Sequence, residues 1–275
     1  MKHLEAIAAH ALAIAATVFA LYPLFWVFGL ALSPTGLSSD ARMWPLSSSP
    51  SLANARALVE GNPHFWTQLG NSLVISFATA TVAIVLALPA SYALARFSFL
   101  GAKAGLRTML WTQMFPGVAS AVPLYAILQT LGLLDSRLGL VLVYATTAIP
   151  FAVLQLKGAF ETIPVELEEA AWVDGASRLR AFITVVLPAA RPAIAVTFLF
   201  AFMSAWNEFI LAATLLSRES AFTMPVVLQR LVGEHAARWG VFAAGALVVS
   251  IPVIALFSVA QKSLVAGLTA GGVKG

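Results

Sequence analysis

The chain has 275 residues, of which 60% are apolar and only 10% are charged, against roughly 25% charged residues in an average soluble domain. So few polar residues cannot cover the surface of a soluble protein of this size, and the composition therefore indicates a protein of the lipid bilayer. The net charge of +4 is too small and too scattered for a nucleic-acid groove, and the absence of cysteine excludes disulfides, thiolate catalysis and Cys-ligated zinc.

The charged residues leave long uncharged gaps between them. A helix that crosses a membrane needs about 20 mostly apolar residues. Five uncharged gaps are long enough: 6–39, 61–95, 108–134, 138–156 and 239–261. A sixth apolar segment, 192–217, contains one charged residue, Glu208. We therefore predict an all-α, polytopic membrane protein with six transmembrane helices.

The first gap follows Lys2 and Glu5, and a cleaved signal peptide is an alternative there. Its apolar run over 12–32 is longer than the 7–15 residues typical of the apolar part of a signal peptide. We therefore expect a retained span. The prolines and serines of 33–65 predict an extended loop outside the membrane.

The basic residues predict the orientation. The short loop between the second and third predicted spans contains Arg96, Lys103 and Arg107 and no acidic residue. Loops rich in Lys and Arg stay in the cytoplasm. With an even number of spans, both termini and the loop 157–191 are then cytoplasmic.

A charged island interrupts the apolar sequence in that cytoplasmic loop. Pro164 suits the first position of a helix, and Glu166, Glu168 and Glu169 fall in its first turns, where the helix dipole favours negative charge. Gly175 can adopt a positive φ and is expected to end this helix.

A second helix is predicted directly after it. Ser177 can cap its start, apolar residues recur with helical period, and Pro188 is expected to end it. The pair could lie in the lipid headgroups, but such helices usually carry Lys and Arg on their polar face. The first helix carries only acids, which favours a protein partner.

The segment 169–192, EAAWVDGASRLRAFITVVLPAARP, resembles the EAA loop of permease subunits of bacterial ABC importers. In that pattern Glu-Ala-Ala and Asp-Gly-Ala are followed by a Phe, a Leu-Pro and a further Pro, and every element is present. The stretches 71–97 and 206–217 agree with the family, and the end GLTAGGVKG is close to the tail of the smaller permeases of maltose transporters. The resemblance implies one transmembrane domain over 1–275, with the core permease fold at about 70–266, the EAA loop at 157–191 and a tail at 267–275.

The resemblance also implies what the EAA loop does. In this family the loop forms a coupling helix that docks on a cytoplasmic ATPase. The implied coupling residues are Glu168, Glu169, Ala170, Ala171, Asp174, Gly175, Ala176, Leu187 and Pro188.

The implied partners are a second permease in a heterodimer, two copies of the ATPase, an extracytoplasmic sugar-binding protein and the lipid bilayer, with no nucleic acid. ATP and magnesium would bind to the ATPase, because the chain has no G-x-x-x-x-G-K-[ST] phosphate loop. We expect no cofactor, metal or catalytic residue on the chain itself, and hence no enzyme activity of its own.

Asn207 and Glu208 are candidates for the translocation path or its outer gate. A charge near the bilayer centre costs about 2.5–3.5 kcal/mol and usually faces a cavity or a partner. Alternatively, Glu208 lies near the outer interface and pairs with a residue of the second permease.

The tail contains four glycines between 267 and 275, each costing a helix about 1 kcal/mol relative to Ala. We therefore predict a non-helical tail that contacts the ATPase through Gly271, Gly272 and Lys274. A frayed terminus is the alternative.

The expected function is that of a permease subunit of an ATP-driven oligosaccharide importer in the bacterial cytoplasmic (inner) membrane, forming half of the translocation pathway. Maltose or maltodextrin is the first substrate expected, with trehalose and other disaccharides behind. The alternative is a subunit of a secondary transporter or channel, which would favour paired half-repeats or more ionisable groups within the spans.

Overall fold

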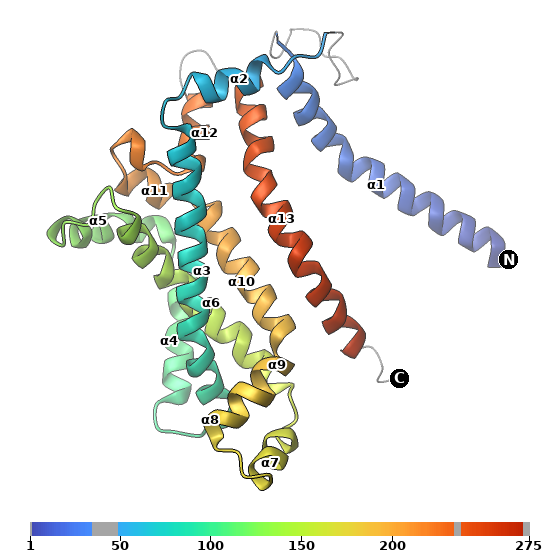
Figure 1. The fold of residues 1–275 in the computed structure, drawn as a ribbon, viewed down its shortest axis with the longest axis vertical. Coiled ribbons are helices and arrows are strands. Elements are labelled where there is room, and N and C mark those ends of the chain that lie inside the picture. The colour runs from blue at the N-terminus through green and yellow to red at the C-terminus, as the bar shows by residue number, and fades with distance from the viewer. Residues whose placement is uncertain (1, 35–48, 234–237, 272–275) are drawn as a thin grey trace. The chain divides into compact units, whose positions relative to one another are not determined.

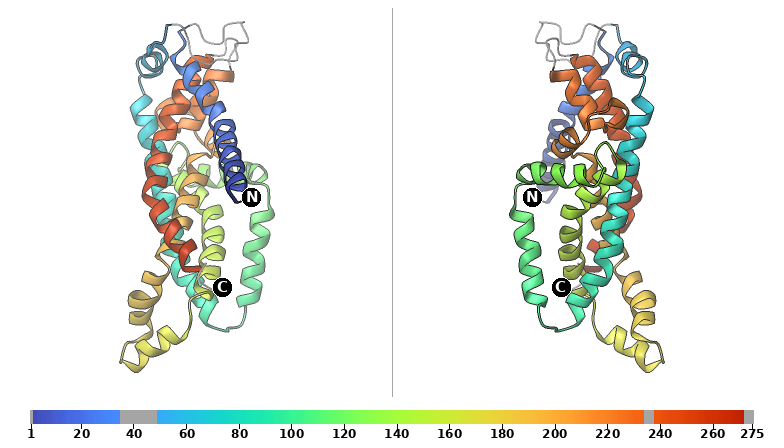
Figure 2. Two further views of the ribbon diagram at one scale, coloured as in Figure 1. Left: turned by 90° about the vertical axis from the view of Figure 1, so that its right-hand side faces the viewer. Right: turned by 90° about the vertical axis from the view of Figure 1, so that its left-hand side faces the viewer.

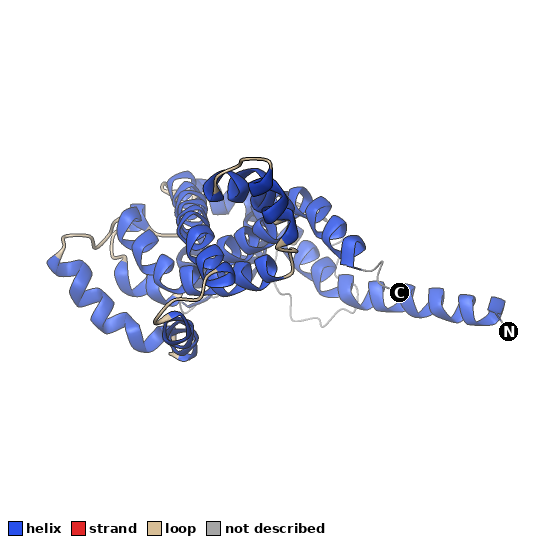
Figure 3. Cartoon of the chain, turned by 90° about the horizontal axis from the view of Figure 1, so that it is seen from below, coloured by secondary structure: helices blue, strands red, loops and turns tan. Residues whose placement is uncertain are grey.

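The computed structural model describes residues 2–34, 49–233 and 238–271. Every regular element within these ranges is a helix (Figure 3), so the predicted all-α fold is confirmed. The elements are α1 (Lys2–Leu32), α2 (Ala53–Glu60), α3 (Phe65–Arg96), α4 (Ala102–Met114), η1 (Gly117–Ser120), α5 (Ala121–Thr130), α6 (Arg137–Glu161), α7 (Glu166–Val173), α8 (Arg178–Ala181), η2 (Phe182–Val186), α9 (Leu187–Ala189), α10 (Arg191–Trp206), α11 (Ile210–Leu215), η3 (Glu219–Ala221), α12 (Met224–Gly233) and α13 (Trp239–Gly271).

The chain divides into two compact units, which are described separately. The first comprises Met1–Trp66 and Val226–Pro252, and the second comprises Thr67–Pro225 and Val253–Gly275. The single transmembrane domain over 1–275 stays a prediction.

In the first unit, the end of α1 packs against the beginning of α13. Ala31 on α1 and Ala243 and Ala244 on α13 are buried together, because small side chains let two helices approach closely. The Asn54 side chain, on α2, donates hydrogen bonds to the carbonyls of Ala31 and Ser33 at 3.0 and 2.8 Å. These carbonyls belong to the last turn of α1 and its exit, where helical partners are missing.

The extended loop predicted over 33–65 is wrong for 53–60, which form α2. Leu58 is buried, and Arg56 pairs with Glu60 one turn later. A buried leucine and an i,i+4 ion pair both favour a helix. Prolines 45, 50 and 63, which predicted a loop, all lie outside α2, and residues 35–48 lie outside the described residues.

Four of the predicted spans are present as long apolar helices. They cover Glu5–Leu32, Phe65–Arg96, Arg137–Glu161 and Trp239–Gln261, and a bent pair, Arg178–Ala189 with Arg191–Trp206, is a fifth candidate. The count of six spans stays a prediction, because the segments predicted at 108–134 and 192–217 are not single helices.

The third predicted segment is built from α4, η1 and α5, which run in clearly different directions (Figure 2). The break lies at Phe115 and Pro116, both with extended backbone. Proline has no N–H to donate and disfavours helical backbone at the residue before it. The chain therefore leaves the helix where a continuous span was expected.

The fifth predicted segment starts and ends differently from the expectation. Pro188 does not end the second loop helix, because it occupies the first turn of α9, where a missing N–H is tolerated. The helix instead bends by 74° between Ala189 and Arg191. At its other end α10 stops at Trp206, and a new helix, α11, begins at Ile210.

In the second unit, α6 is the best-buried helix. Ala152, Val153, Leu156 and Phe160 have no exposed surface, and α4 and α10 pack against α6. α7 and the beginning of α8 lie beyond the ends of α3 and α6, and α8 and α9 lead back to α10 (Figure 1). The charged island is therefore outside the apolar helices, as its composition predicted.

The predicted non-helical tail is wrong as far as Gly271, because α13 continues to that residue. Extending an existing helix adds one backbone hydrogen bond per residue, whereas starting one is costly. Glycine at the end of a long helix therefore opposes helicity less than a count of glycines suggests.

Candidate functional site

The first helix of the charged island, α7, ends in a Schellman motif. The amide of Ala176 donates to the carbonyl of Ala171 at 2.9 Å, and the amide of Gly175 donates to that of Trp172 at 3.0 Å. Gly175 has φ +87°, a conformation that glycine adopts at little cost. Both the helix end and the turn predicted from Gly175 are confirmed.

The second helix begins as predicted. The Ser177 hydroxyl accepts a hydrogen bond from the amide of Arg180, three residues on, at 3.3 Å. The helix then widens into a π-helical turn over Phe182–Val186. Ser177 therefore sets the start of α8, directly after the turn at Gly175.

Glu168 is buried among residues of α3. Its side chain is only 1% exposed, and that of Arg96 is 9% exposed. Arg96 Nε donates to Glu168 Oε1 at 2.6 Å, and Tyr92 Oη donates to Glu168 Oε2 at 2.5 Å. A second guanidinium nitrogen of Arg96 donates to the carbonyl of Ile163 at 2.8 Å. Each carboxylate oxygen thus has a donor, which satisfies the buried charge. We call Tyr92, Arg96 and Glu168 the Glu168 clasp.

An aromatic layer surrounds this clasp. The ring of Tyr92 lies 4.4 Å from that of Phe182, and Phe160 packs edge-on against both rings. The guanidinium of Arg178 lies over Phe97 and Trp172, at 5.5 and 5.4 Å from the ring centres. The rings hold both helices of the loop against the end of α3.

A pocket of about 400 Å³ lies beside the clasp. Arg96, Glu168, Trp172 and Arg178 are among its lining residues. Trp172 Nε1 is buried and has no hydrogen-bond partner within the described part of the chain.

The structure separates the predicted coupling residues into two groups. Glu169, Ala170, Asp174 and Gly175 are exposed on the outer surface of the loop, whereas Glu168 is buried. The remaining predicted residues, all of intermediate exposure, are Ala171, Ala176, Leu187 and Pro188. The neighbouring side chains of Glu168 and Glu169 therefore lie on different sides of the helix, because successive residues on a helix are about 100° apart.

The sequence did not point to Tyr92 or Arg96 as partners of this loop. From the sequence, Arg96 is only a basic residue at the end of an apolar span. Tyr92 lies one helical turn before Arg96, and this pair of polar residues in an apolar helix was the available signal. Nothing local identified their partner Glu168, which lies 72 residues after Arg96.

Glu208 lies in the short segment between α10 and α11. Its Oε1 accepts from the amide of Leu211 at 2.9 Å, and its Oε2 accepts from the amide of Ala212 at 3.1 Å and from Tyr144 Oη at 2.9 Å. It thereby caps the first turn of α11. Both oxygens already have partners within the chain, so the structure gives Glu208 a capping role that was not predicted from the sequence.

Asn207, the other candidate for the path, is exposed. Its side-chain amide donates to the carbonyl of Met203 at 2.9 Å. The assignment of Asn207 and Glu208 to a path or gate stays a prediction.

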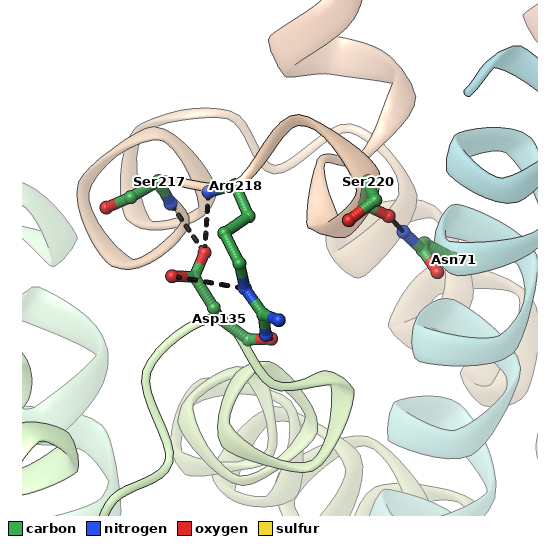
Figure 4. Close-up of polar contacts among 5 residues, drawn as sticks. All are labelled: Asn71, Asp135, Ser217, Arg218 and Ser220. Atoms are coloured by element: carbon green, nitrogen blue, oxygen red, sulfur yellow. Dashed lines mark hydrogen bonds and ion pairs between the residues drawn. The ribbon is translucent and has the colours of Figure 1, made fainter. Parts of the chain in front are cut away.

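A second polar cluster lies near the start of α3 (Figure 4). Asp135 Oδ1 accepts hydrogen bonds from the amides of Ser217 and Arg218 at 2.6 and 2.9 Å. The side-chain amide of Asn71 donates to the carbonyl of Ser220 at 2.9 Å and accepts from Arg137 Nε at 2.7 Å. We call the segment 217–222 the outer strap, because the predicted orientation places it on the outer side of the membrane.

Asp135 has an unusual backbone conformation and a shifted side-chain pKa. Its φ is +53°, a left-handed conformation that Asp tolerates better than most residues. Desolvation raises the pKa of Asp135, but the amides of Arg218 and Ser217 and the Arg218 guanidinium outweigh it and lower the pKa below its usual value. The outer strap was not predicted, because its contacts join residues more than 80 positions apart.

Of the predicted tail contacts, Gly271 is the last residue of α13. Gly272 and Lys274 lie outside the described residues. Among the described residues, no three His, Asp or Glu side chains gather as metal ligands.

Residues 82–269 match the model of the protein family described as "Binding-protein-dependent transport system inner membrane component". The trehalose transport system permease protein of Mycobacterium tuberculosis is 38% identical over 94% of this chain and 93% of its own length. The maltose/maltodextrin transport system permease protein of Yersinia pestis is 35% identical over 100% of this chain and 95% of its own.

The solved structure of a bacterial ABC transporter involved in import of the acidic polysaccharide alginate contains a similar chain. The two chains have a TM-score of 0.75 and 25% identity, over 95% of this chain and 96% of that one. The resemblance inferred from the EAA loop is confirmed, and the relatives are membrane subunits that catalyse no reaction themselves. The chain belongs to the family of inner membrane components of binding-protein-dependent transport systems.

Proposed function

We propose that this chain is a permease subunit of an ATP-driven importer for oligosaccharides, and that α7 docks on the ATPase of that importer. The observation that carries the proposal is the division of α7. Glu169 and Ala170 are exposed, while Glu168, on the same helix, is fixed to α3. A helix attached on one side and exposed on the other is suited to receive force from a partner.

The exposed side of α7 has the chemistry of a docking surface. Leu167 and Val173 are 49% and 88% exposed, and Glu169 adds a carboxylate to these apolar groups. Exposed apolar side chains with a charged rim are typical of protein interfaces. A partner surface with an apolar cleft and an arginine would complement it.

The substrate class rests on the named relatives. Their names refer to trehalose and to maltose and maltodextrin, and a further relative, from Streptomyces coelicolor, is a diacetylchitobiose uptake permease with 34% identity over 92% of each chain. A disaccharide or short oligosaccharide is the substrate class that these names share. We propose maltose or maltodextrin, and trehalose, as the first sugars to test.

The remaining parts of the proposal follow the family. The chain would pair with a second permease and bind two copies of the ATPase, with a sugar-binding protein outside the cytoplasm. Both termini would be cytoplasmic. The tail would contact the ATPase through Gly271, Gly272 and Lys274.

The test is purification of the complex with its ATPase and reconstitution in liposomes with the binding protein. We expect uptake of labelled maltose or trehalose that requires ATP, and loss of ATPase co-purification in Gly175→Pro at unchanged membrane insertion. Uptake that proceeds without ATP would instead support the secondary-transporter alternative. Stoichiometric ATPase on Gly175→Pro would contradict docking through α7.

A further inference from the structure

We infer that the Glu168 clasp is the joint through which displacement of α7 reaches the membrane helices, with Glu168 as a positioning residue distinct from the docking residue Glu169. This inference rests on the proposed function and adds a mechanical role within it. It concerns contacts inside the chain, whereas the proposed function concerns contacts with the ATPase.

The contacts of Arg96 join three segments. Its guanidinium binds Glu168 on α7 and the carbonyl of Ile163, which lies between α6 and α7. Arg96 itself is the last residue of α3, a 32-residue apolar helix. One side chain therefore connects the end of a helix long enough to cross a membrane, the exit from α6 and the proposed docking helix.

Burial makes this joint stiff. The Glu168 and Arg96 side chains are 1% and 9% exposed, so separating them would leave two charges with neither water nor partner. Tyr92 adds a short hydrogen bond to the second carboxylate oxygen. The three groups fix both the distance and the direction of α7 relative to the end of α3.

The second helix of the loop is fixed to the same point. Phe182 packs on the Tyr92 ring, whose hydroxyl holds Glu168. Phe160, on α6, is fully buried against both rings. A push on either helix of the loop is therefore transmitted to α3 and α6 and is not absorbed by bending at Gly175.

The decisive variant is Glu168→Gln, which keeps the shape of the side chain and removes its charge. We expect normal insertion and normal co-purification of the ATPase. Sugar uptake should fall by at least about tenfold, the factor that corresponds to one lost charge-assisted hydrogen bond. ATP hydrolysis should no longer rise when the sugar-loaded binding protein is added.

Two further variants complete the experiment. Tyr92→Phe keeps the ring and the ion pair, so we expect the same uncoupling with a smaller loss of uptake. Glu161→Gln, at the end of α6 outside the docking helix and with a side chain that is 50% exposed, is the matched control and should behave as the unmodified complex. If Glu168→Gln fails to insert, Tyr92→Phe decides alone, and its full coupling would overturn the inference.

The outcomes separate this inference from the proposed function. Normal uptake and normal stimulation in Glu168→Gln would overturn the joint while leaving docking intact. Loss of ATPase co-purification in Glu168→Gln would also overturn it, since Glu168 would then act in docking. Failure of the unmodified chain to bind any ATPase would refute the proposed function itself.

Discussion

At the Arg96 end of α3, an ion pair with almost no exposed surface holds α7. Near the Asn71 end, about 37 Å away along the helix axis, the outer strap is held partly by an ion pair in which the Arg218 side chain is 68% exposed. Both ends of one helix thus hold a segment far away in the sequence. They differ in how much water reaches the charges.

This difference matters because burial decides what an ion pair contributes. A buried pair is costly to break, since each charge is left without solvent. An exposed pair contributes little and is screened by salt. The contrast indicates that α7 is firmly attached to α3, whereas the outer strap depends chiefly on the hydrogen bonds of Asn71 and on those that the Asp135 carboxylate accepts from backbone amides.

The largest expected effect is that of Arg96→Ala, which leaves Glu168 buried without its cation. We expect the free energy of unfolding to fall by about 3–5 kcal/mol. The matched variant Arg218→Ala should change it by only about 0–1 kcal/mol. Thermal unfolding of the purified chain in detergent measures both, and equal losses would remove the distinction between the two ends.

Asn71→Ala should have the next largest effect. Asn71 is 2% exposed and donates to the carbonyls of Ser220 and Phe222 at 2.9 and 3.1 Å. Leaving buried carbonyls without a donor costs about 1–3 kcal/mol. Hydrogen exchange should become faster in the outer strap and stay unchanged in α7.

The control for that experiment is Gln113→Ala. Gln113 is exposed and donates one hydrogen bond, to the carbonyl of Thr147 at 2.8 Å. Its removal should alter exchange very little. An outer strap whose exchange is unaffected by Asn71→Ala would show that the amide is not what holds it.

Gly175→Ala tests the turn between α7 and α8. No atom lies within 4 Å of the added Cβ, so the cost is that of the left-handed backbone alone, about 1–2 kcal/mol. Gly158→Ala, also with nothing within 4 Å but inside α6, should instead stabilise by about 0.5–1 kcal/mol. Opposite signs in thermal unfolding are the expected result, and a shared sign would contradict this account of Gly175.

The smallest effect concerns the acid response of the outer strap. The lowered pKa of Asp135 means that its contribution to stability is complete above the pKa of the unfolded chain and is lost as the pH falls through the folded value. Stability should therefore drop below about pH 4. Asp135→Asn should lack that part of the drop, and an identical pH profile in both proteins would argue against it.

Local patterns predicted much of the backbone of the loop that contains α7 and α8. Gly175 and Ser177 each act on backbone within a few residues, so their effects could be derived from the sequence. Pro164 was wrong as the first helical residue, because α7 begins at Glu166 with Val165 as its N-cap and Pro164 lies just before that cap. Most of the apolar spans could be predicted for a similar reason, since the bilayer imposes both length and composition.

Contacts between distant residues could not be predicted in this way. The burial of Glu168 depends on its ion pair with Arg96. The role of Glu208 depends on the break between α10 and α11, which the apolar composition of the segment does not indicate. Pro116 is a different case, because its helix-breaking effect is local. The prediction of a continuous span there gave apolar composition priority over the backbone chemistry of proline.

The Schellman motif at Gly175 has a consequence for how fast a partner can associate. With its end closed by two hydrogen bonds and its inner side fixed at Glu168, α7 is fully formed before any partner arrives. Ordering an unstructured segment on binding would cost about 1–2 kcal/mol per residue. A partner of α7 avoids that cost, so its association is a rigid-body encounter, limited by diffusion and orientation and not by folding. The accompanying change in heat capacity then reflects only the surface buried at the contact.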